Sequence, residues 1–334
     1  MDIRIAILGC GYWGPNLIRN FYEQEFTKVV CVCDVAQERL LPVRKRYPDI
    51  EVSCDPMAVL RRADIDAVVI ATPIFTHFAL AKAALENQKH ILVEKPLAPS
   101  VEEAKQLVDL AAKYKRTLMV DHTFVYTGAV MKIHQLISEG SLGDIYYYDS
   151  VRANLGLLQR DVNVVWDLAT HDLSIIDYIF SKSPVAVSAT AGSHVGKTEE
   201  VAYITVFFED NRIAHLHVNW LSPVKIRKTL IGGSLKMLVY DDVEPSEKIR
   251  VYDKGVDMVR EEHERSLRVS YRSGDIWTPK LKEHEALSEV ANEFLSAILE
   301  ARPALTDGIS GLRVVKLLEA AARSIKMRGQ EIKI

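Results

Sequence analysis

Six residues near the N-terminus, GCGYWG at 9–14, place the tightest constraint on the fold of this 334-residue chain. They follow an apolar run at 3–8 and precede an amphipathic segment at 15–23, so the G-x-G-x-x-G pattern predicts a strand, a tight turn and a helix. The first glycine of such a turn permits the bend, the second lets the backbone approach a pyrophosphate, and the third lets helix and strand pack closely. Free amides of the helix's first turn face the anion. The stretch therefore predicts a dinucleotide-binding unit.

Asp34 supports the same interpretation and selects between two dinucleotides. It ends a second apolar run at 28–33, 20 residues after Gly14. A carboxylate at this spacing accepts hydrogen bonds from the adenosine ribose and repels a 2′-phosphate. The next two residues are apolar, and the first basic residue is Arg39. The sequence therefore favours NAD over NADP, against the alternative that Asp34 is only a turn residue at a strand end.

The rest of the N-terminal third alternates between short apolar runs and helical segments. Further strands are expected at 52–54, 67–71, 91–93 and 117–120, and helices at 37–47, 56–62, 79–86 and 101–113. Ser100 and Glu103 form a capping box at the start of the last of these helices. This alternation predicts an α/β fold with a doubly wound parallel Rossmann sheet, forming a dinucleotide-binding domain over residues 1–121.

After Asp121 the pattern changes to strands with period-two alternation. These runs lie at 145–153, 185–189, 201–208, 212–220, 225–232 and 235–240. They predict a large open, mostly antiparallel sheet in an α+β domain over residues 122–334, with helices on one face and a charged, irregular excursion at 241–282. Large side chains such as Tyr203 and Trp220 on the open face predict an oligomer interface, and so a homodimer or homotetramer through this sheet.

Lys95 is the first candidate for chemistry. It follows the apolar strand 91–93 in the stretch HILVEKPLAP, and open α/β sheets bind ligands at the carboxyl ends of their strands. Pro96 disfavours a helical conformation at Lys95 and so directs the chain's exit. An ammonium group held there can bind a developing alkoxide or relay a proton. The alternative is an ordinary strand-end lysine in water.

Asp167 and His171 form the second candidate, in the stretch WDLATHD at 166–172. Residues four apart on a helix share a face, so the carboxylate and the imidazole make a plausible acid–base pair. The carboxylate would raise the histidine pKa. The alternatives are a solvated pair on a helix face and a buried structural histidine.

Composition excludes several classes of partner. A net charge of -3 gives no electrostatic reason to expect nucleic acid or a membrane surface. No apolar run approaches membrane-spanning length and no signal peptide is expected. The four cysteines, all within the first 54 residues, predict reduced core thiols of a cytoplasmic protein. His215 and His217 lack a carboxylate at ligand spacing, so no metal is expected.

Four stretches together resemble the Gfo/Idh/MocA family of oxidoreductases. They are GCGYWG at 9–14, ATPIFTH at 71–77, AALENQKHILVEKPLA at 83–98 and TDGISGLRVVKLLEAAARS at 306–324. The resemblance implies an NAD(P)-dependent dehydrogenase that transfers a hydride between NAD and a secondary alcohol. It also implies that Lys95 faces His171 and Asp167 across a cleft, with His171 as the base.

The expected site comprises residues that contact the cofactor and residues that contact the substrate. Cofactor contacts are expected at Gly9, Gly11, Tyr12, Trp13, Gly14, Asp34, Thr72, Pro73, His77, Glu94 and Lys95. Substrate contacts are expected, from the positions of their loops and helix, at Tyr126, Arg152, Asn154, Asn163 and His171.

The substrate class is suggested by two stretches. GCGYWGPN at 9–16 and WDLATHDLSIIDYI at 166–179 resemble family members from surface-polysaccharide clusters, which are similar to 3-dehydrogenases of UDP-N-acetylglucosamine and related nucleotide sugars. The small-molecule substrate is therefore expected to be a nucleotide sugar. An inositol or free-sugar dehydrogenase is the alternative within the family. A non-catalytic NAD-binding sensor and a non-redox lyase that uses tightly held NAD transiently also stay open.

Overall fold

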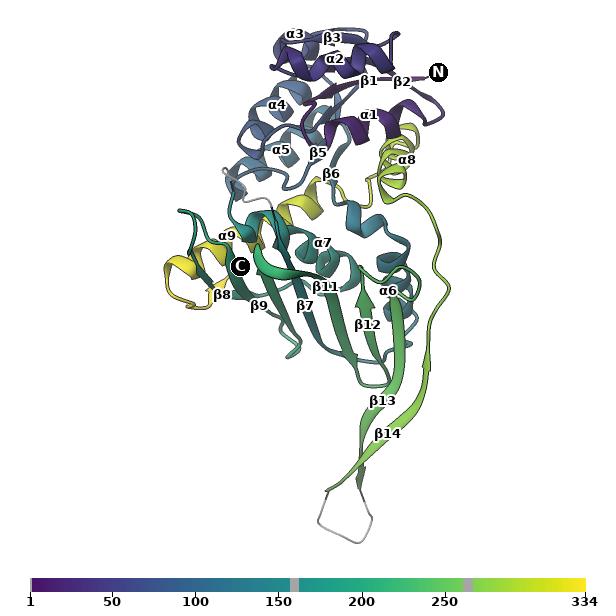
Figure 1. Ribbon diagram of the computed structural model, residues 1–334, viewed down its shortest axis with the longest axis vertical. Coiled ribbons are helices and arrows are strands. Elements are labelled where there is room, and N and C mark those ends of the chain that lie inside the picture. Colours follow the sequence, from purple (N-terminus) through teal and green to yellow (C-terminus); the bar gives the residue numbers. More distant parts are fainter. Residues whose placement is uncertain (1, 157–161, 261–266) are drawn as a thin grey trace. The chain divides into compact units, whose positions relative to one another are not determined.

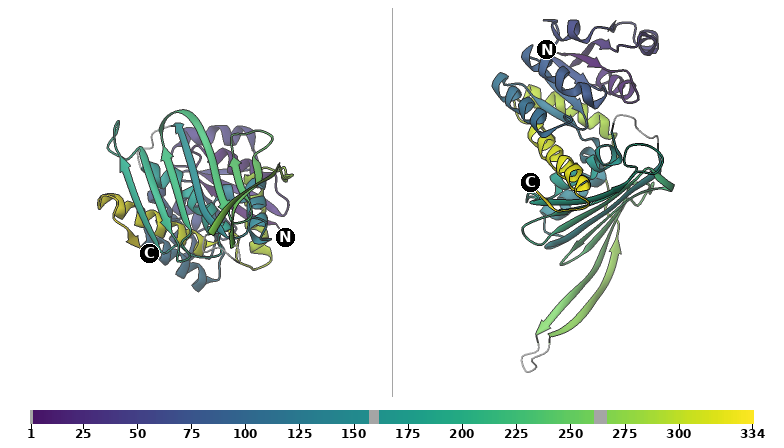
Figure 2. Two further views of the ribbon diagram at one scale, coloured as in Figure 1. Left: turned by 90° about the horizontal axis from the view of Figure 1, so that it is seen from below. Right: turned by 90° about the vertical axis from the view of Figure 1, so that its left-hand side faces the viewer.

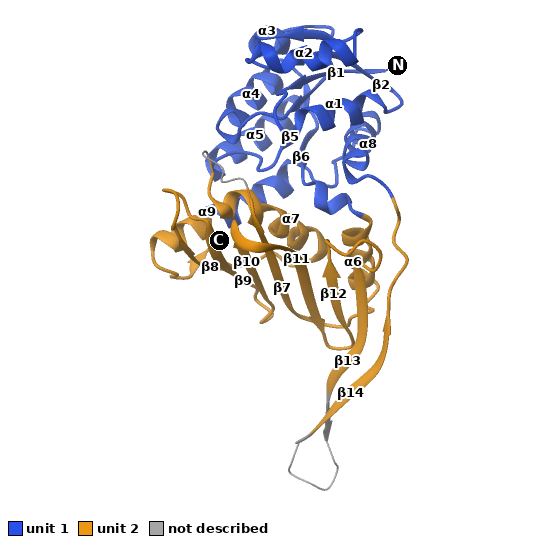
Figure 3. Ribbon diagram, in the orientation of Figure 1, with its two compact units in different colours: residues 1–127, 284–319 blue, residues 128–283, 320–334 orange. Residues whose placement is uncertain are grey.

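The computed structural model describes residues 2–156, 162–260 and 267–334. The chain divides into two compact units (Figure 3), Met1–Thr127 with His284–Glu319, and Gly128–Glu283 with Ala320–Ile334. It therefore returns to the first unit after forming the sheet of the second. The predicted division into domains 1–121 and 122–334 concerns which parts fold independently, and it remains a prediction.

The first unit is built on a six-stranded parallel sheet with the order β3-β2-β1-β4-β5-β6 (Figure 1). Its strands are β1 Ile3–Leu8, β2 Thr27–Cys33, β3 Glu51–Ser53, β4 Ala67–Ile70, β5 His90–Glu94 and β6 Leu118–Asp121. Every neighbouring pair is parallel, so all six carboxyl ends lie at one edge. The order reverses at β1, which makes the glycine turn after β1 the expected ligand position. The doubly wound Rossmann sheet is confirmed.

The helices of this unit come from both ends of the chain. They are α1 Gly14–Tyr22, α2 Gln37–Arg46, α3 Pro56–Leu60, α4 Ile74–Glu86, α5 Val101–Tyr114, the 3-10 helix Thr123–Tyr126, α8 Ala286–Leu299 and the first part of α9 Gly308–Lys326. Ser100 caps α5 as predicted, because its side chain accepts the Glu103 N–H at 3.3 Å. Helix α8 packs on α1, where the Phe21 and Phe294 rings meet edge to face at 6.2 Å.

The second unit is built on a nine-stranded sheet with the order β14-β13-β12-β11-β7-β10-β9-β8-β15. Its strands are β7 Ile145–Leu155, β8 Ala186–Gly192, β9 Val201–Phe207, β10 Ile213–Asn219, β11 Leu221–Gly233, β12 Met237–Asp241, β13 Ile249–Arg260, β14 Leu267–Trp277 and β15 Ile332–Lys333. Only the β7–β10 pair is parallel among these described strands. The predicted mostly antiparallel sheet is confirmed.

Three helical segments accompany this sheet, namely α6 Gly128–Ser138, a π-helical turn Val165–Ala169 and α7 Thr170–Ile179, together with the end of α9. Side chains alternate between buried and exposed along β9 and β10, as a sheet with one covered face requires. Asp172 of α7 binds Arg152 of β7, which places α7 on the covered face.

Three sequence-based expectations need correction. The excursion of the sheet expected at 241–282 is present, but its described part is regular where β13 and β14 form a long antiparallel ribbon that runs beyond the other strands of its sheet (Figure 2). Trp220 does not lie on the open face, because its side chain is only 1% exposed, whereas Tyr203 is 45% exposed. Cys54 is exposed, unlike the three buried cysteines, because it follows the short edge strand β3.

Candidate active site

The glycine turn has the shape that a dinucleotide requires. Gly9 has φ +101°, and a Cβ there would lie 2.4 Å from the Ala71 carbonyl oxygen. A Cβ on Gly14 would lie 2.3 Å from the Gly9 carbonyl oxygen, so both positions need glycine for close packing. A Cβ on Gly11 would meet no described atom within 4 Å, which leaves open space where a phosphate can approach. The N-cap residue Trp13 makes no side-chain hydrogen bond to the first amides of α1, so these amides are available to an anion. These residues fit NAD.

Asp34 holds this turn from the next strand. Its Oδ2 accepts the Cys10 N–H at 2.7 Å and its Oδ1 accepts the Ala36 N–H at 2.8 Å. The carboxylate is buried, and the Arg39 guanidinium lies 3.6 Å away. Each oxygen retains a lone pair for a ribose hydroxyl. Asp34 therefore supports the turn in addition to its predicted role toward the ribose.

The loop after β4 is braced by His77, which is buried. Its Nδ1 lies 2.9 Å from the Pro96 carbonyl oxygen and its Nε2 lies 2.8 Å from the Thr72 carbonyl oxygen. Burial lowers the pKa of His77. The ring thus joins the loops that follow β4 and β5, and direct contact between the His77 ring and a cofactor is disfavoured. The predicted contacts at Thr72 and Pro73 remain proposals.

Lys95 lies beside a pair of carboxyl groups. Glu94 ends β5, and its register partner at the end of β6 is Asp121. The Lys95 backbone N–H donates to Glu94 Oε2 at 3.1 Å, and the Thr123 hydroxyl donates to Asp121 Oδ1 at 2.6 Å. Burial raises the pKa of Asp121 to about 6 and that of Glu94 well above its usual value, and the proximity of Asp121 raises the pKa of Glu94 further. Asp121 is a candidate that the sequence analysis does not identify.

The second candidate pair lies in the second unit. Asp167 belongs to the π-helical turn, and His171 to the first turn of α7. Trp220 donates its indole N–H to Asp167 Oδ2 at 3.2 Å. The acid–base pairing of Asp167 with His171, and its position facing Lys95, remain proposals. Trp220 is a further residue that the sequence pattern does not connect with this site.

Two of the predicted substrate residues, Tyr126 and Arg152, have side chains bonded to other residues of the protein. Tyr126 is buried, with its hydroxyl 2.9 Å from Thr306 Oγ1. Arg152 is buried in an ion pair with Asp172, at 2.9 Å between Nε and Oδ2. These internal bonds favour structural roles for Tyr126 and Arg152 over contact with a ligand.

The two asparagines show a similar contrast. Asn163 accepts the Trp166 N–H at 3.1 Å and donates to Glu199 at 2.9 Å, so it supports the start of the helical segment that carries Asp167. Asn154 is half-buried near the end of β7. Its contact with substrate remains a proposal.

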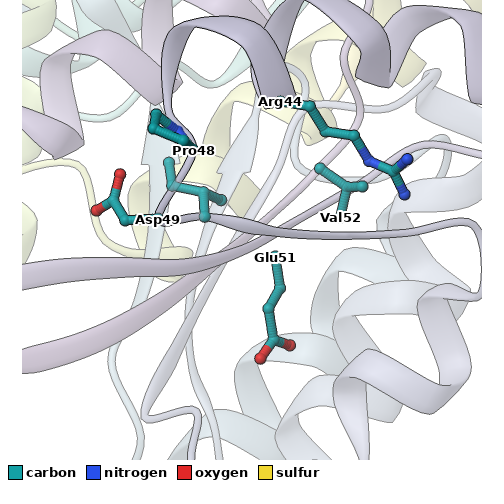
Figure 4. Close-up of a pocket in the computed structure, with 6 residues that line it drawn as sticks. Arg44, Pro48, Asp49, Glu51 and Val52 are labelled. Atoms are coloured by element: carbon teal, nitrogen blue, oxygen red, sulfur yellow. The ribbon is translucent and has the colours of Figure 1, made fainter.

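A surface hollow occurs elsewhere in the first unit (Figure 4). Its lining comes from α2, the turn that follows and β3, and consists of Arg44, Pro48, Asp49, Ile50, Glu51 and Val52. None of the predicted site residues belongs to this hollow. Among the described residues, no helix combines the length and apolar character of a membrane span, and no group of three histidine, cysteine or acidic side chains is arranged for a metal.

Two family profiles match the chain in succession. The profile of the oxidoreductase family, NAD-binding Rossmann fold, of Gfo/Idh/MocA type matches residues 3–122, and that of the Gfo/Idh/MocA C-terminal domain matches residues 130–239. The chain belongs to the Gfo/Idh/MocA family. It is accordingly an oxidoreductase of a family that includes dehydrogenases acting on CH–OH groups, and its first unit is the NAD-binding domain.

Similar proteins in this family extend over the whole chain. UDP-N-acetylglucosamine 3-dehydrogenase from Acidithiobacillus ferrooxidans is 24% identical over 98% of this chain and 97% of its own length. A solved structure of that enzyme aligns with a TM-score of 0.81 at 23% identity, covering 98% of each chain. Inositol 2-dehydrogenase from Rhizobium meliloti is 24% identical, with 99% of both chains covered. GenD2 from gentamicin A biosynthesis, solved in complex with NAD, aligns with a TM-score of 0.83 at 21% identity, covering 100% of this chain and 96% of that one.

Proposed function

We propose that this protein is an NAD-dependent dehydrogenase of a nucleotide-linked sugar, acting on a secondary hydroxyl, C3 of a UDP-N-acetylhexosamine. The observation that carries the proposal is the full-length similarity to UDP-N-acetylglucosamine 3-dehydrogenase in both sequence and fold. The position of Lys95 supports a role in the reaction, because Lys95 follows β5 at the sheet edge that also carries the glycine turn. The reaction would serve nucleotide-sugar or polysaccharide biosynthesis in the cytoplasm.

The protein's own residues divide the remaining tasks between them. NAD, when bound, supplies the acceptor of the hydride. His171 takes the proton of the substrate hydroxyl, and Asp167 orients the imidazole and favours its protonated form. The Lys95 ammonium stabilises the negative charge that develops on the substrate oxygen and shares in the proton relay. Asp34 binds the adenosine ribose, and the residues Gly9–Gly14 bind the pyrophosphate.

The open face of the second unit's sheet supports assembly into a homodimer or homotetramer. Tyr203 is 45% exposed, and its ring is stacked with those of His217 and His215, at 4.5 Å and 6.3 Å between ring centroids. Ile213 on the neighbouring strand β10 is also exposed. Aromatic and apolar side chains gathered on one face are typical of interfaces between subunits.

The first experiment measures NADH formation with a panel of UDP-sugars, free hexoses and inositols. Lys95→Ala is the test variant, and Lys105→Ala, at an exposed position of α5, is the matched control. A UDP-sugar-dependent signal that is lost in Lys95→Ala and retained in the control supports the proposal. Reaction with inositol or a free sugar instead would overturn the substrate class, and reaction with inositol would favour the activity named for the Rhizobium meliloti relative.

Silence across the panel would overturn the dehydrogenase proposal for these substrates. Product analysis by mass spectrometry then separates the two remaining functions. A product without net change in oxidation state indicates a lyase that uses NAD transiently. No product, with tight NAD binding retained, indicates a sensor.

A further inference from the structure

The carboxyl groups of Glu94 and Asp121 are placed together by the backbone. They end the parallel strands β5 and β6 as register partners, so both side chains point to the same face of the sheet. Both carboxyl groups are held in place, because the Lys95 N–H binds Glu94 and the Thr123 hydroxyl binds Asp121. The pair therefore forms part of the rigid edge of the sheet.

One oxygen of this pair is buried without a recorded donor. Asp121 Oδ2 is buried and receives no bond from any nitrogen or hydroxyl donor among the described residues. The nearest acidic neighbour that the strand register supplies is Glu94, and two carboxyl groups can share a hydrogen bond only if one is protonated. Burial raises the pKa of both groups, which is the direction that retention of a proton by a buried carboxyl pair requires.

The other ionisable groups near the pair determine how readily its carboxyl groups ionise. The Lys95 ammonium favours ionisation of both carboxyl groups. Burial raises the pKa of Tyr126, so the phenol stays neutral, and the His122 ring is buried directly after Asp121. His77, whose pKa is lowered by burial, is also near Lys95. Lys95 therefore supplies the principal positive charge described beside the pair.

We propose that Asp121 is a positioning residue for NAD: it shares one proton with Glu94, and binding of oxidised NAD, but not of NADH, releases that proton. This inference rests on the proposed placement of the nicotinamide end of the cofactor at Glu94. The oxidised ring carries a positive charge, which stabilises the doubly ionised pair, whereas the reduced ring is neutral and leaves the proton in place.

The charge at the nicotinamide ring and the carboxyl pair is conserved during the reaction. Oxidation of an alcohol transfers a hydride to the cofactor and releases one proton from the hydroxyl. His171 takes that proton and passes it to solvent, while the ionised pair regains one proton from solvent as the ring becomes neutral. The summed charge of ring and pair is therefore the same before and after.

Calorimetry of cofactor binding in two buffers of different ionisation enthalpy, without any sugar, tests the proposal directly. At a pH near 7 we expect release of a fraction of a proton, of the order of half, when NAD binds to the parent protein, and none when NADH binds. The affinity for NAD should rise by about three- to tenfold between about pH 6 and about pH 9, while that for NADH stays flat. Equal proton release with both cofactors, or none with either, would overturn the proposal.

Two variants assign the effect to the pair. In Asp121→Asn the amide donates to Glu94, which then ionises, so proton release and the pH dependence of NAD affinity should disappear. Thr123→Val removes the donor that stabilises ionised Asp121, so the pH dependence should move to higher pH by about half a unit. Asp109→Asn, an exposed change on α5, is the control and should behave as the parent.

The outcomes separate this inference from the proposed function. Persistence of proton release in Asp121→Asn would overturn the inference, and if that variant does not fold, the parent calorimetry and Thr123→Val decide it. Proton release without turnover of any sugar would leave the inference standing and overturn the proposed dehydrogenase function alone.

Discussion

The indole N–H of Trp220 donates a hydrogen bond to Oδ2 of Asp167, with 3.2 Å between the two atoms. Trp220 is buried, and its backbone is bound on both sides: its N–H donates to the Glu200 carbonyl at 2.9 Å and its carbonyl accepts the Gly156 N–H at 3.2 Å. A fully packed side chain therefore orients the carboxylate proposed to act on His171. Such a partner restricts the rotation of Asp167 more than water would.

Trp220→Phe should lower kcat while leaving the KM for NAD unchanged. The substitution keeps most of the buried ring and removes the N–H, so the orientation of Asp167 is lost without a large cavity. A loss of about tenfold in kcat is expected for one misplaced supporting hydrogen bond. Steady-state kinetics check this, with Trp277→Phe on the partly exposed end of β14 as the control. An unchanged kcat would remove Trp220 from the site.

Asp34→Ala should weaken NAD binding and destabilise the first unit. The change leaves the buried N–H of Cys10 and the N–H of Ala36 without their acceptor, at a cost of about 1–3 kcal/mol in the free energy of unfolding. It also frees Arg39 from its carboxylate partner, so the preference for NAD over NADP should fall by about tenfold or more. Cofactor titration and denaturant unfolding measure the two effects. Arg39→Ala in the same background is the control, because it should abolish any gained affinity for NADP.

One thiol should react in the native protein and four in the unfolded protein. Burial raises the pKa of Cys10 and Cys31 to about 11 and that of Cys33 to about 12, and all three side chains are buried. Cys54 is exposed and therefore accessible to a thiol reagent. Titration with a chromogenic disulfide in the presence and absence of denaturant gives the two counts, and Cys54→Ser should reduce the native count to zero. Fast reaction of a second native thiol would contradict the buried placement.

Local patterns in the sequence predict the first unit well. The glycine turn, the spacing to Asp34 and the apolar runs each depend on neighbouring residues, and the parallel sheet follows from their alternation. Helix α8 marks the limit of this reasoning. Its apolar periodicity predicts a helix, but its partner α1 lies near the other end of the chain, and nothing local shows which sheet it covers.

The candidate site shows the same limit at the level of side chains. Glu94 and Asp121 meet only through the register of β5 and β6, which no spacing in the sequence encodes. Trp220 has the alternating pattern of a sheet residue, yet it lies at the junction of β10 and β11, where its side chain turns inward to Asp167. The π-helical turn around Asp167 has no periodic signal that distinguishes it from the start of α7.

His90 should make the protein lose stability as the pH falls. Its Nδ1 accepts the Thr117 N–H at 3.0 Å, so the bond requires a neutral ring, and Arg116 lies 3.5 Å from Nε2. Burial, with a smaller contribution from Arg116, lowers the pKa of His90 from 6.5 to about 4. Because protonation occurs more readily in the unfolded chain, the stabilisation is fully present above about pH 6.5 and is lost progressively as the pH falls toward about 4.

His90→Gln tests this directly, since glutamine cannot take up a proton in this range. Its free energy of unfolding should fall less steeply with acid than that of the parent, by about 1–2 kcal/mol between neutral pH and pH 4 after allowance for partial exposure. Denaturant unfolding at several pH values measures the difference. His194→Gln, at an exposed position, should retain the parent's slope. Parallel curves for the parent and His90→Gln would contradict the assignment, because other buried histidines such as His77 contribute equally to both proteins.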